Sequence, residues 1–242
     1  MSPATNTIEI RAIRVVVVAL AVSILVSACS TEVAGNPRAS SPPPLLEQNQ
    51  IEALLPTAEQ TAQVVDGPHI EIGAALRAIK AFPFPISDPN CFASISEATE
   101  PAYRDSGYGP VRGFILTEPG GNLHAREHLV GEAVVLYHTP QQADALVSHI
   151  VEQWSTCANK TLTEYPPGMA PQNWPLGSPN ADDDVHTLFN SQEAAGGWGC
   201  SRAITSRRNV VIDVRVCSKA GEAALNNQAA TLVHTIAAKI PF

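Results

Sequence analysis

The sequence contains few charged residues and no cluster of basic ones. Lysine, arginine, aspartate and glutamate make up only 16% of the 242 residues, and 15 basic side chains stand against 23 acidic ones, giving a formal charge of −8. Arg207 and Arg208 form an isolated basic pair. Binding to nucleic acid needs clustered cations that neutralise phosphates. The composition therefore argues against nucleic acid as a partner.

Cysteine is also scarce, and its five copies lie far apart. None of them forms the short C-x₂₋₄-C spacing of a zinc site. Four of them, Cys91, Cys157, Cys200 and Cys217, are well-separated thiols that in an exported domain indicate two disulfides. Two disulfides would consume these thiols, so Cys-His nucleophilic catalysis is disfavoured.

The C-terminal half gives a geometric reason to choose among the three possible pairings. Two strand-like segments, 199–206 and 210–216, flank Arg208-Asn209, and asparagine is favoured in tight hairpin turns. With Arg208-Asn209 as a two-residue loop, Cys200 faces Cys217 at a non-hydrogen-bonded position, where Cα atoms lie about 4.5 Å apart. We therefore predict a Cys200–Cys217 bridge and, by elimination, a Cys91–Cys157 bridge.

The first 30 residues carry an export signal. Two arginines precede an apolar run at 15–26 that is too short to span a bilayer, which is typical of a signal peptide. The run ends at Val-Ser-Ala-Cys29, which resembles the lipobox of bacterial lipoproteins, whose cysteine is acylated after the preceding peptide is removed. We predict a lipoprotein signal peptide at 1–28 and lipidation of Cys29, which would anchor the protein on the extracytoplasmic face of the cell membrane.

The remainder divides into a tether and one domain. Residues 29–44 are rich in serine and proline and predict a flexible spacer, whereas 45–242 is long enough for one buried core. Apolar periodicity and capping residues predict helices at 45–55, 57–65, 73–81, 94–103 and 223–238, and one that begins at Thr139 and has an apolar stripe up to Trp154. Alternating segments predict strands at 111–117, 129–137, 160–165 and 185–190, besides the hairpin. Short turns between these strands predict an α+β domain with an antiparallel sheet covered by helices.

Several short motifs then occur in a characteristic order. They are Leu54-Leu-Pro-Thr57, Cys91, Trp154-Ser-Thr-Cys157, Trp198-Gly-Cys200 and the strand that ends at Cys217. Together they resemble the PknH-like extracellular sensor domain of mycobacteria, over about residues 45–242. That resemblance implies a twisted antiparallel sheet flanked by helices, two disulfides and a cleft for an unidentified ligand. In this family the domain is the external part of a transmembrane Ser/Thr kinase or stands alone. This chain contains none of the Gly-rich, His-Arg-Asp or Asp-Phe-Gly motifs of a kinase.

One string has the pattern of a metalloprotease. His124-Ala-Arg-Glu127-His128 matches H-x-x-E-H, whose chemistry needs both histidines on one helical turn. Glycines precede the string and a predicted strand follows it, and on a strand the two histidines would lie roughly 13 Å apart, too far for one metal ion. We therefore expect no zinc site here.

Other candidates have simpler explanations. Asp182-Asp183-Asp184 with His186 offers oxygen ligands, but a solvated acidic turn is favoured. No Gly-x-Ser-x-Gly elbow is present, and Gly107-Tyr-Gly109 lacks the following helix of a phosphate loop. Of the three tryptophans, Trp154 belongs to a helical apolar stripe, whereas Trp174 and Trp198 could line a glycan-binding surface, Trp174 being the better surface candidate.

The sequence thus predicts a membrane-anchored, non-catalytic module that binds a small apolar or glycan ligand in a cleft, with no cofactor, metal site or catalytic residue. An envelope component or an envelope protein is a possible partner. Two alternatives stay open: a divergent cell-envelope hydrolase, and a structural lipoprotein that docks on another envelope protein through its sheet.

Overall fold

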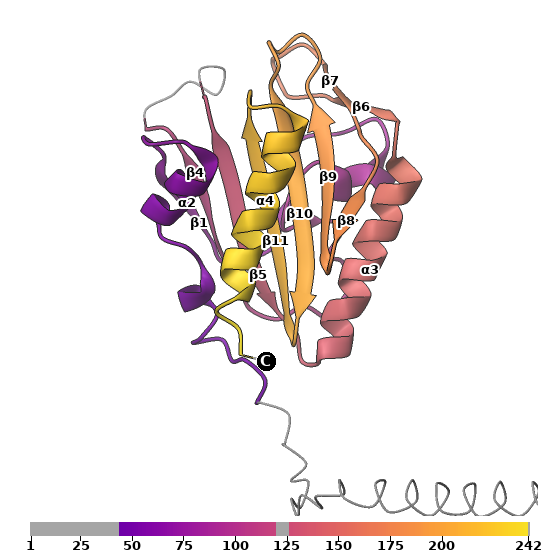
Figure 1. Cartoon of the computed structure of the whole chain (residues 1–242). Helices are drawn as coiled ribbons and strands as arrows, with labels where there is room; N and C mark the ends of the chain where they lie inside the picture. The colour runs from indigo at the N-terminus through magenta and orange to yellow at the C-terminus, as the bar shows by residue number, and fades with distance from the viewer. Residues whose placement is uncertain (1–43, 120–125, 242) are drawn as a thin grey trace, which may run out of the picture. The chain divides into compact units, whose positions relative to one another are not determined.

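A seven-stranded sheet forms the centre of the computed structural model, which describes residues 44–119 and 126–241. The strand order is β1-β4-β5-β11-β10-β9-β8, and every neighbouring pair is antiparallel. Helices lie on both faces of the sheet (Figure 1), which confirms the predicted α+β class. Within the described residues no helix is both long and apolar enough to cross a membrane.

The elements have the following bounds. The central strands are β1 (Glu71–Leu76), β4 (Val111–Thr117), β5 (Leu129–Leu136), β8 (Asn180–Asp182), β9 (Val185–Ser191), β10 (Gly199–Arg207) and β11 (Val210–Ser218). Two small sheets pair β2 (Lys80–Ala81) with β3 (Thr99–Glu100), and β6 (Thr161–Glu164) with β7 (Gln172–Pro175). The helices are α2 (Ala58–Val65), α3 (Pro140–Cys157) and α4 (Glu222–Ala237), with the 3₁₀ turns η1 (Glu52–Leu54) and η2 (Pro89–Ser94).

The β10–β11 hairpin has the predicted register. Cys200 pairs with Cys217, their Cα atoms lie 4.0 Å apart, and a disulfide joins them. The two-residue loop is Arg208-Asn209, as predicted, between the paired Arg207 and Val210, and the positive φ in it, of 55°, belongs to Arg208. The buried Asn209 side chain hydrogen-bonds the backbone N–H and carbonyl of Leu46 and so fixes the chain where it enters the domain.

A second disulfide joins Cys91 in η2 to Cys157 at the end of α3, as predicted, with a Cα–Cα distance of 5.8 Å. It closes a loop with a sequence separation of 66. The two disulfides therefore have different structural roles. One links strands that are already paired, and the other fixes an irregular segment to a helix.

One face of the sheet is covered by α4 and α2 and is almost entirely apolar. Helix α4 packs on β9, β10 and β11, and α2 packs on α4. Leu225, Leu232 and Ile236 of α4 are completely buried against the valines and isoleucine of β11. Burial of each such side chain contributes roughly 1.5–3 kcal/mol. This layer is the main hydrophobic core.

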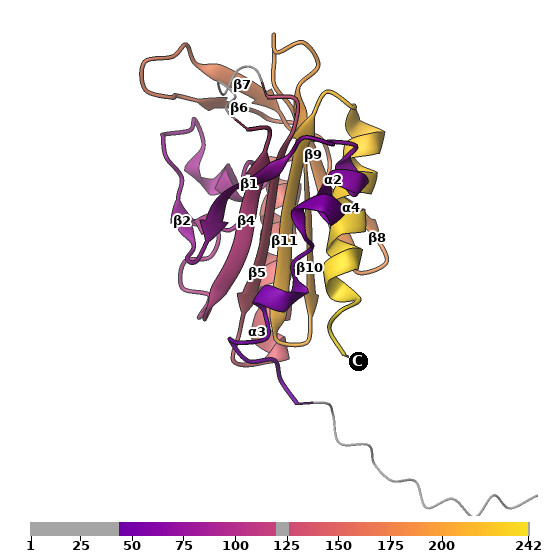
Figure 2. The ribbon, with the colours of Figure 1, turned by 90° about the vertical axis from the view of Figure 1, so that its left-hand side faces the viewer.

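The opposite face carries only one long helix. Helix α3 begins at a capping box between Thr139 and Gln142, and its apolar stripe packs on β10, β11 and η2. The rest of this face is covered by the irregular segment 77–110 and by the β6–β7 hairpin. Figure 2, which views the sheet from its β1 edge, shows β2 and the β6–β7 hairpin on one side and α2 and α4 on the other.

Three predicted helices are wrong. Residues 73–81 are alanine-rich, but 73–76 lie beside the edge of β4, which supplies backbone partners, and form the end of β1, while 80–81 form β2. Residues 45–55 contain only the short η1, because Leu46 is held by Asn209. Residues 94–103 are held by charged side chains of the sheet, as described below. In each case a tertiary contact outweighs helix propensity, which is a weak preference.

Candidate functional site

The polar network that organises the candidate site begins with a buried ion pair. Arg202 on β10 and Asp213 on β11 are diagonal neighbours across the hairpin, since Arg202 pairs with Arg215 and Asp213 with Ile204, and their side chains are 1% and 0% exposed. Asp213 also accepts hydrogen bonds from the Tyr103 hydroxyl at 2.8 Å and the Ala98 N–H at 2.9 Å. Burial and the nearby Asp213 carboxylate raise the pKa of Tyr103 well above its usual value, so its hydroxyl stays a donor.

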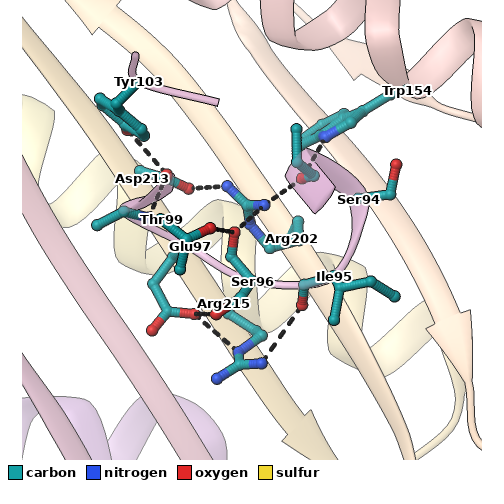
Figure 3. A network of polar contacts seen from close by, with 12 residues as sticks. Ser94, Ile95, Ser96, Glu97, Thr99, Tyr103, Trp154, Arg202, Asp213 and Arg215 are labelled. Carbon is teal, nitrogen blue, oxygen red and sulfur yellow. Dashed lines mark hydrogen bonds and ion pairs between the residues drawn. The ribbon is translucent and has the colours of Figure 1, made fainter. Parts of the chain in front are cut away.

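Arg202 also holds the backbone at the end of η2 and just after it. Its guanidinium donates to the carbonyls of Ala93 and Ser96, the latter at 2.6 Å (Figure 3). The same group lies 5.5 Å from the ring centroid of Trp154, whose indole N–H donates to the Ala93 carbonyl at 2.7 Å. These side-chain bonds offer the backbone an alternative to helical hydrogen bonds and hold the segment in its irregular path after η2.

A second charged pair extends the network towards the surface. Arg215 on β11 donates to the Ile95 carbonyl at 3.3 Å, and its Nε lies 2.8 Å from a carboxylate oxygen of Glu97. Glu97 reaches Arg215 across Gly131, which is paired with Arg215 in β5. A Cβ at position 131 would come within 2.3 Å of the Glu97 carboxylate. Glycine is therefore needed there for the pair to form.

The other side of this segment borders a cleft of about 630 Å³. Its floor is formed by the sheet, including the Cys200–Cys217 disulfide, Leu129 and Arg215. One wall is the segment 95–99 with β2 and the residues after it, and the other is the β6–β7 hairpin with the loop 192–198. The charged network thus holds one wall of the cleft to the floor.

Four aromatic side chains line the cleft. Phe82 and Phe84 pack edge to face, with ring centroids 4.8 Å apart, on the β2 side. Trp174 on β7 and Trp198 lie on the other side. A concave volume of several hundred Å³ that combines aromatic and aliphatic side chains with polar and charged ones is typical of a small-molecule site.

Glu164 is the most perturbed polar group of the cleft. It ends β6, it is 5% exposed, and burial raises its pKa to about 7. Arg215 lowers the pKa again in part, and so does the nearby Trp174 indole N–H, although this N–H makes no hydrogen bond among the described residues. A carboxyl group in this state can accept or donate a hydrogen bond near neutral pH.

The structure places the predicted site residues as follows. All four disulfide cysteines lie around the cleft region, and Cys200 and Cys217 line it. Cys29, the signal peptide at 1–28 and all but the last residue of the tether lie outside the described residues. Trp154 is completely buried, as predicted. Trp174 and Trp198 line one cleft, but Trp174 is only 8% exposed and is not a surface residue.

The two sequence motifs that resemble metal sites do not form one among the described residues. Glu127 and His128 lie in the extended chain that leads into β5, not on a helix, and His128 Nδ1 is 2.8 Å from Glu118. His124 lies outside the described residues. Asp182, Asp183 and Asp184 are exposed at the β8–β9 turn, as predicted for a solvated acidic turn. Among the described residues, no three His, Cys, Asp or Glu side chains are grouped as metal ligands.

Sequence reasoning missed the charged residues of the network and the cleft. Arg202, Asp213 and Arg215 occur in strands that otherwise read as buried, and that was the available signal, because a charge in a buried strand needs a partner. Glu97 and Glu164 carry no such signal. Glu97 lies in an irregular segment and Glu164 at the end of the short strand β6, and the burial of both depends on distant parts of the chain.

Fold and site together define a two-disulfide α+β domain with a preformed cleft of ligand size. Residues 46–239 match the model of the PknH-like extracellular domain, and the chain belongs to this family. Membership places the domain outside the cytoplasm.

The comparisons also identify individual relatives. The serine/threonine-protein kinases PknH of Mycobacterium bovis and Mycobacterium tuberculosis are 28% identical over 222 residues, which is 92% of this chain and 34–36% of the kinases. The chain thus spans about a third of the length of these relatives. The crystal structure of the extracellular domain of PknH from M. tuberculosis superposes with a TM-score of 0.75 at 28% identity, over 81% of this chain and 97% of that one. The domain is therefore homologous to an extracellular sensor region.

Proposed function

We propose that this protein is a stand-alone, lipid-anchored sensor-type module that binds a small envelope molecule in its aromatic cleft without chemically changing it. The observation that carries the proposal is the cleft itself, with a volume of about 630 Å³ and walls formed by Phe82, Phe84, Trp174 and Trp198. Membership of an extracellular domain family supports the location but does not identify a ligand.

The network beneath the cleft supports binding because it fixes one wall before any ligand arrives. The backbone of Ile95 and Ser96 is bonded to Arg215 and Arg202, and the Cys91–Cys157 bridge holds the preceding turn to α3. A preorganised site loses little conformational entropy on binding, which favours affinity.

Binding is tested by native mass spectrometry of the full-length protein purified from its own host's envelope. We expect a retained small mass that the variant Ala81→Trp does not retain, because Ala81 is exposed and lines the cleft. Ala75→Trp, on the exposed face of β1 and not among the cleft residues, is the matched control. The proposal would be contradicted if the wild-type protein retained no small mass, or if Ala81→Trp and Ala75→Trp retained it equally. Release of a cleaved ligand would favour the hydrolase alternative.

Anchoring is tested separately through Cys29, which follows the apolar run. Cys29→Ala should convert a protein that partitions into detergent into an uncleaved or soluble product, measured by phase separation and N-terminal mass. Cys91→Ala with Cys157→Ala is a useful control, because it removes cysteines without touching the lipobox. Unchanged partitioning and processing of Cys29→Ala would show that the anchor lies elsewhere.

A further inference from the structure

The charge of the cleft differs from that of the protein that contains it. The chain carries a formal charge of −8, yet four cations and three carboxylates line the cleft. Three of the cations, Lys80, Arg126 and Lys219, form no ion pair with any described residue. Unpaired cations gathered in one cleft of an acidic protein indicate a negatively charged ligand.

The carboxylates of the cleft do not cancel this charge. Glu97 is already paired with Arg215. Burial raises the pKa of Glu164 to about 7, so near neutral pH much of this group is uncharged. Glu193 accepts a hydrogen bond from Asn173 on β7 at 2.9 Å and is one carboxylate against the three cations Lys80, Arg126 and Lys219. The cleft therefore has an excess of positive charge.

The cations and the most buried apolar groups of the cleft differ in exposure. Lys80 and Lys219 are exposed and Arg126 is half-buried, whereas Trp174 and the two cysteines of the Cys200–Cys217 disulfide are buried. Lys219 follows β11 and Arg126 precedes β5, and these neighbouring strands bring both residues to the same end of the sheet. Accessible charge together with a buried apolar lining matches a ligand with an anionic head and an apolar body.

We infer that the cleft binds a small amphipathic anion, in which an apolar chain lies between the aromatic walls and a carboxylate or phosphate head lies at Arg126 and Lys219. The inference rests on the proposed function and adds the chemical class of the ligand. Carboxylate and phosphate ligands of this class share a singly or doubly charged oxyanion on an apolar chain.

The test is isothermal titration calorimetry of the purified protein with four twelve-carbon probes below their micelle-forming concentrations. Dodecanoate and dodecyl phosphate should bind at least about tenfold more tightly than methyl dodecanoate, and dodecyltrimethylammonium should bind least. The first two probes distinguish a carboxylate from a phosphate head. Raising the salt concentration should weaken only the anions.

Two variants separate the head from the chain. Arg126→Gln with Lys219→Gln should weaken both anions about tenfold and leave the neutral ester unchanged. Phe84→Ala should weaken all four probes. The charge-matched control is Arg77→Gln with Arg104→Gln, two exposed residues outside the cleft, which should change nothing. Melting curves establish that each variant is folded.

Equal affinity for the ester and the anions, or no effect of the double glutamine variant, would overturn the inference. If the mass retained from the envelope still disappears in Ala81→Trp, the proposed function survives that result and only the ligand class is wrong. If neither the probes nor an envelope molecule occupies the cleft, both proposals fail.

Discussion

The two faces of the central sheet are stabilised in different ways. The face under α4 buries aliphatic side chains such as Leu225, Leu232 and Ile236, with Glu132 as an ionisable exception. The face under α3 buries Arg202 and Asp213 and leaves a cleft where no helix covers it. Both faces use the same strands, with alternate residues directed to each.

The difference shows that stability and shape have separate sources here. Apolar packing is tolerant of small changes and contributes most of the free energy of folding. Buried ion pairs add little net stability because desolvation offsets their attraction, but removing one partner is costly. The charged face therefore fixes the path of one irregular segment, and that path forms a wall of the cleft.

The largest expected effect comes from breaking the buried pair. Asp213→Asn leaves the Arg202 charge uncompensated and should lower the free energy of unfolding by about 3–5 kcal/mol. Leu232→Ala on the other face should cost about 2–5 kcal/mol. Urea unfolding measures both, and calorimetry with dodecanoate should show weaker binding only for Asp213→Asn. Equal loss of binding in the two variants would refute the division of roles.

The disulfides provide a second contrast. In the chain-entropy model, the Cys91–Cys157 loop contributes about 4 kcal/mol and the shorter Cys200–Cys217 loop about 3 kcal/mol. Replacing each pair by alanine should therefore destabilise the first variant more, in urea unfolding without reductant. Peptide mapping of the unreduced protein checks the pairings, and a Cys157–Cys200 peptide would contradict both.

Glu132 tests the exception on the apolar face. Burial raises its pKa to about 7, although Thr61 donates to it at 2.6 Å and Lys239 lies nearby. The folded protein thus holds this proton more tightly than the unfolded chain does. Well below pH 4.5 the ionisation of Glu132 does not affect the free energy of unfolding. As the pH rises from 4.5 to 7 it lowers that free energy progressively, by at most about 3 kcal/mol above pH 7.

Glu132→Gln removes this ionisation and should flatten the fall in stability between pH 4.5 and 7. The variant and the wild type are compared by urea unfolding at pH 5 and pH 8, where the difference should favour the variant at pH 8. Glu164→Gln should behave similarly, because burial raises that pKa also to about 7. The raised pKa values of Glu132 and Glu164 would be contradicted if neither glutamine variant gained stability relative to the wild type between pH 5 and pH 8.

The smallest effect is expected at His128, which lies on neither of the two sets of buried contacts described above. Its partner is Glu118, and both side chains are partly exposed. His128→Gln should cost less than about 1 kcal/mol and leave dodecanoate binding unchanged, in calorimetry and melting experiments. A loss of dodecanoate binding, or the loss of a hydrolytic activity that the wild type has, would indicate that the H-x-x-E-H string belongs to a functional site.

Much of the fold was predictable from local patterns. The Thr139 capping box, the apolar stripe up to Trp154 and the register of Cys200 with Cys217 are set by residues close in the chain, and all three are confirmed. The predicted helix at 73–81 failed because its alternative, pairing with β4, depends on a strand 40 positions away in the sequence. Local helix and strand propensities do not include the effect of a partner strand that is distant in the sequence.

The sequence by itself determined the α+β class, both disulfides and the family, because periodicity, cysteine spacing and motif order are properties of the chain. Only the tertiary structure decided where the cleft lies and what lines it. Glu97, Glu164, Trp174 and Arg215 come from four separate segments. Their burial, and hence their charge state and contacts, follows from how those segments fold onto one face of the sheet.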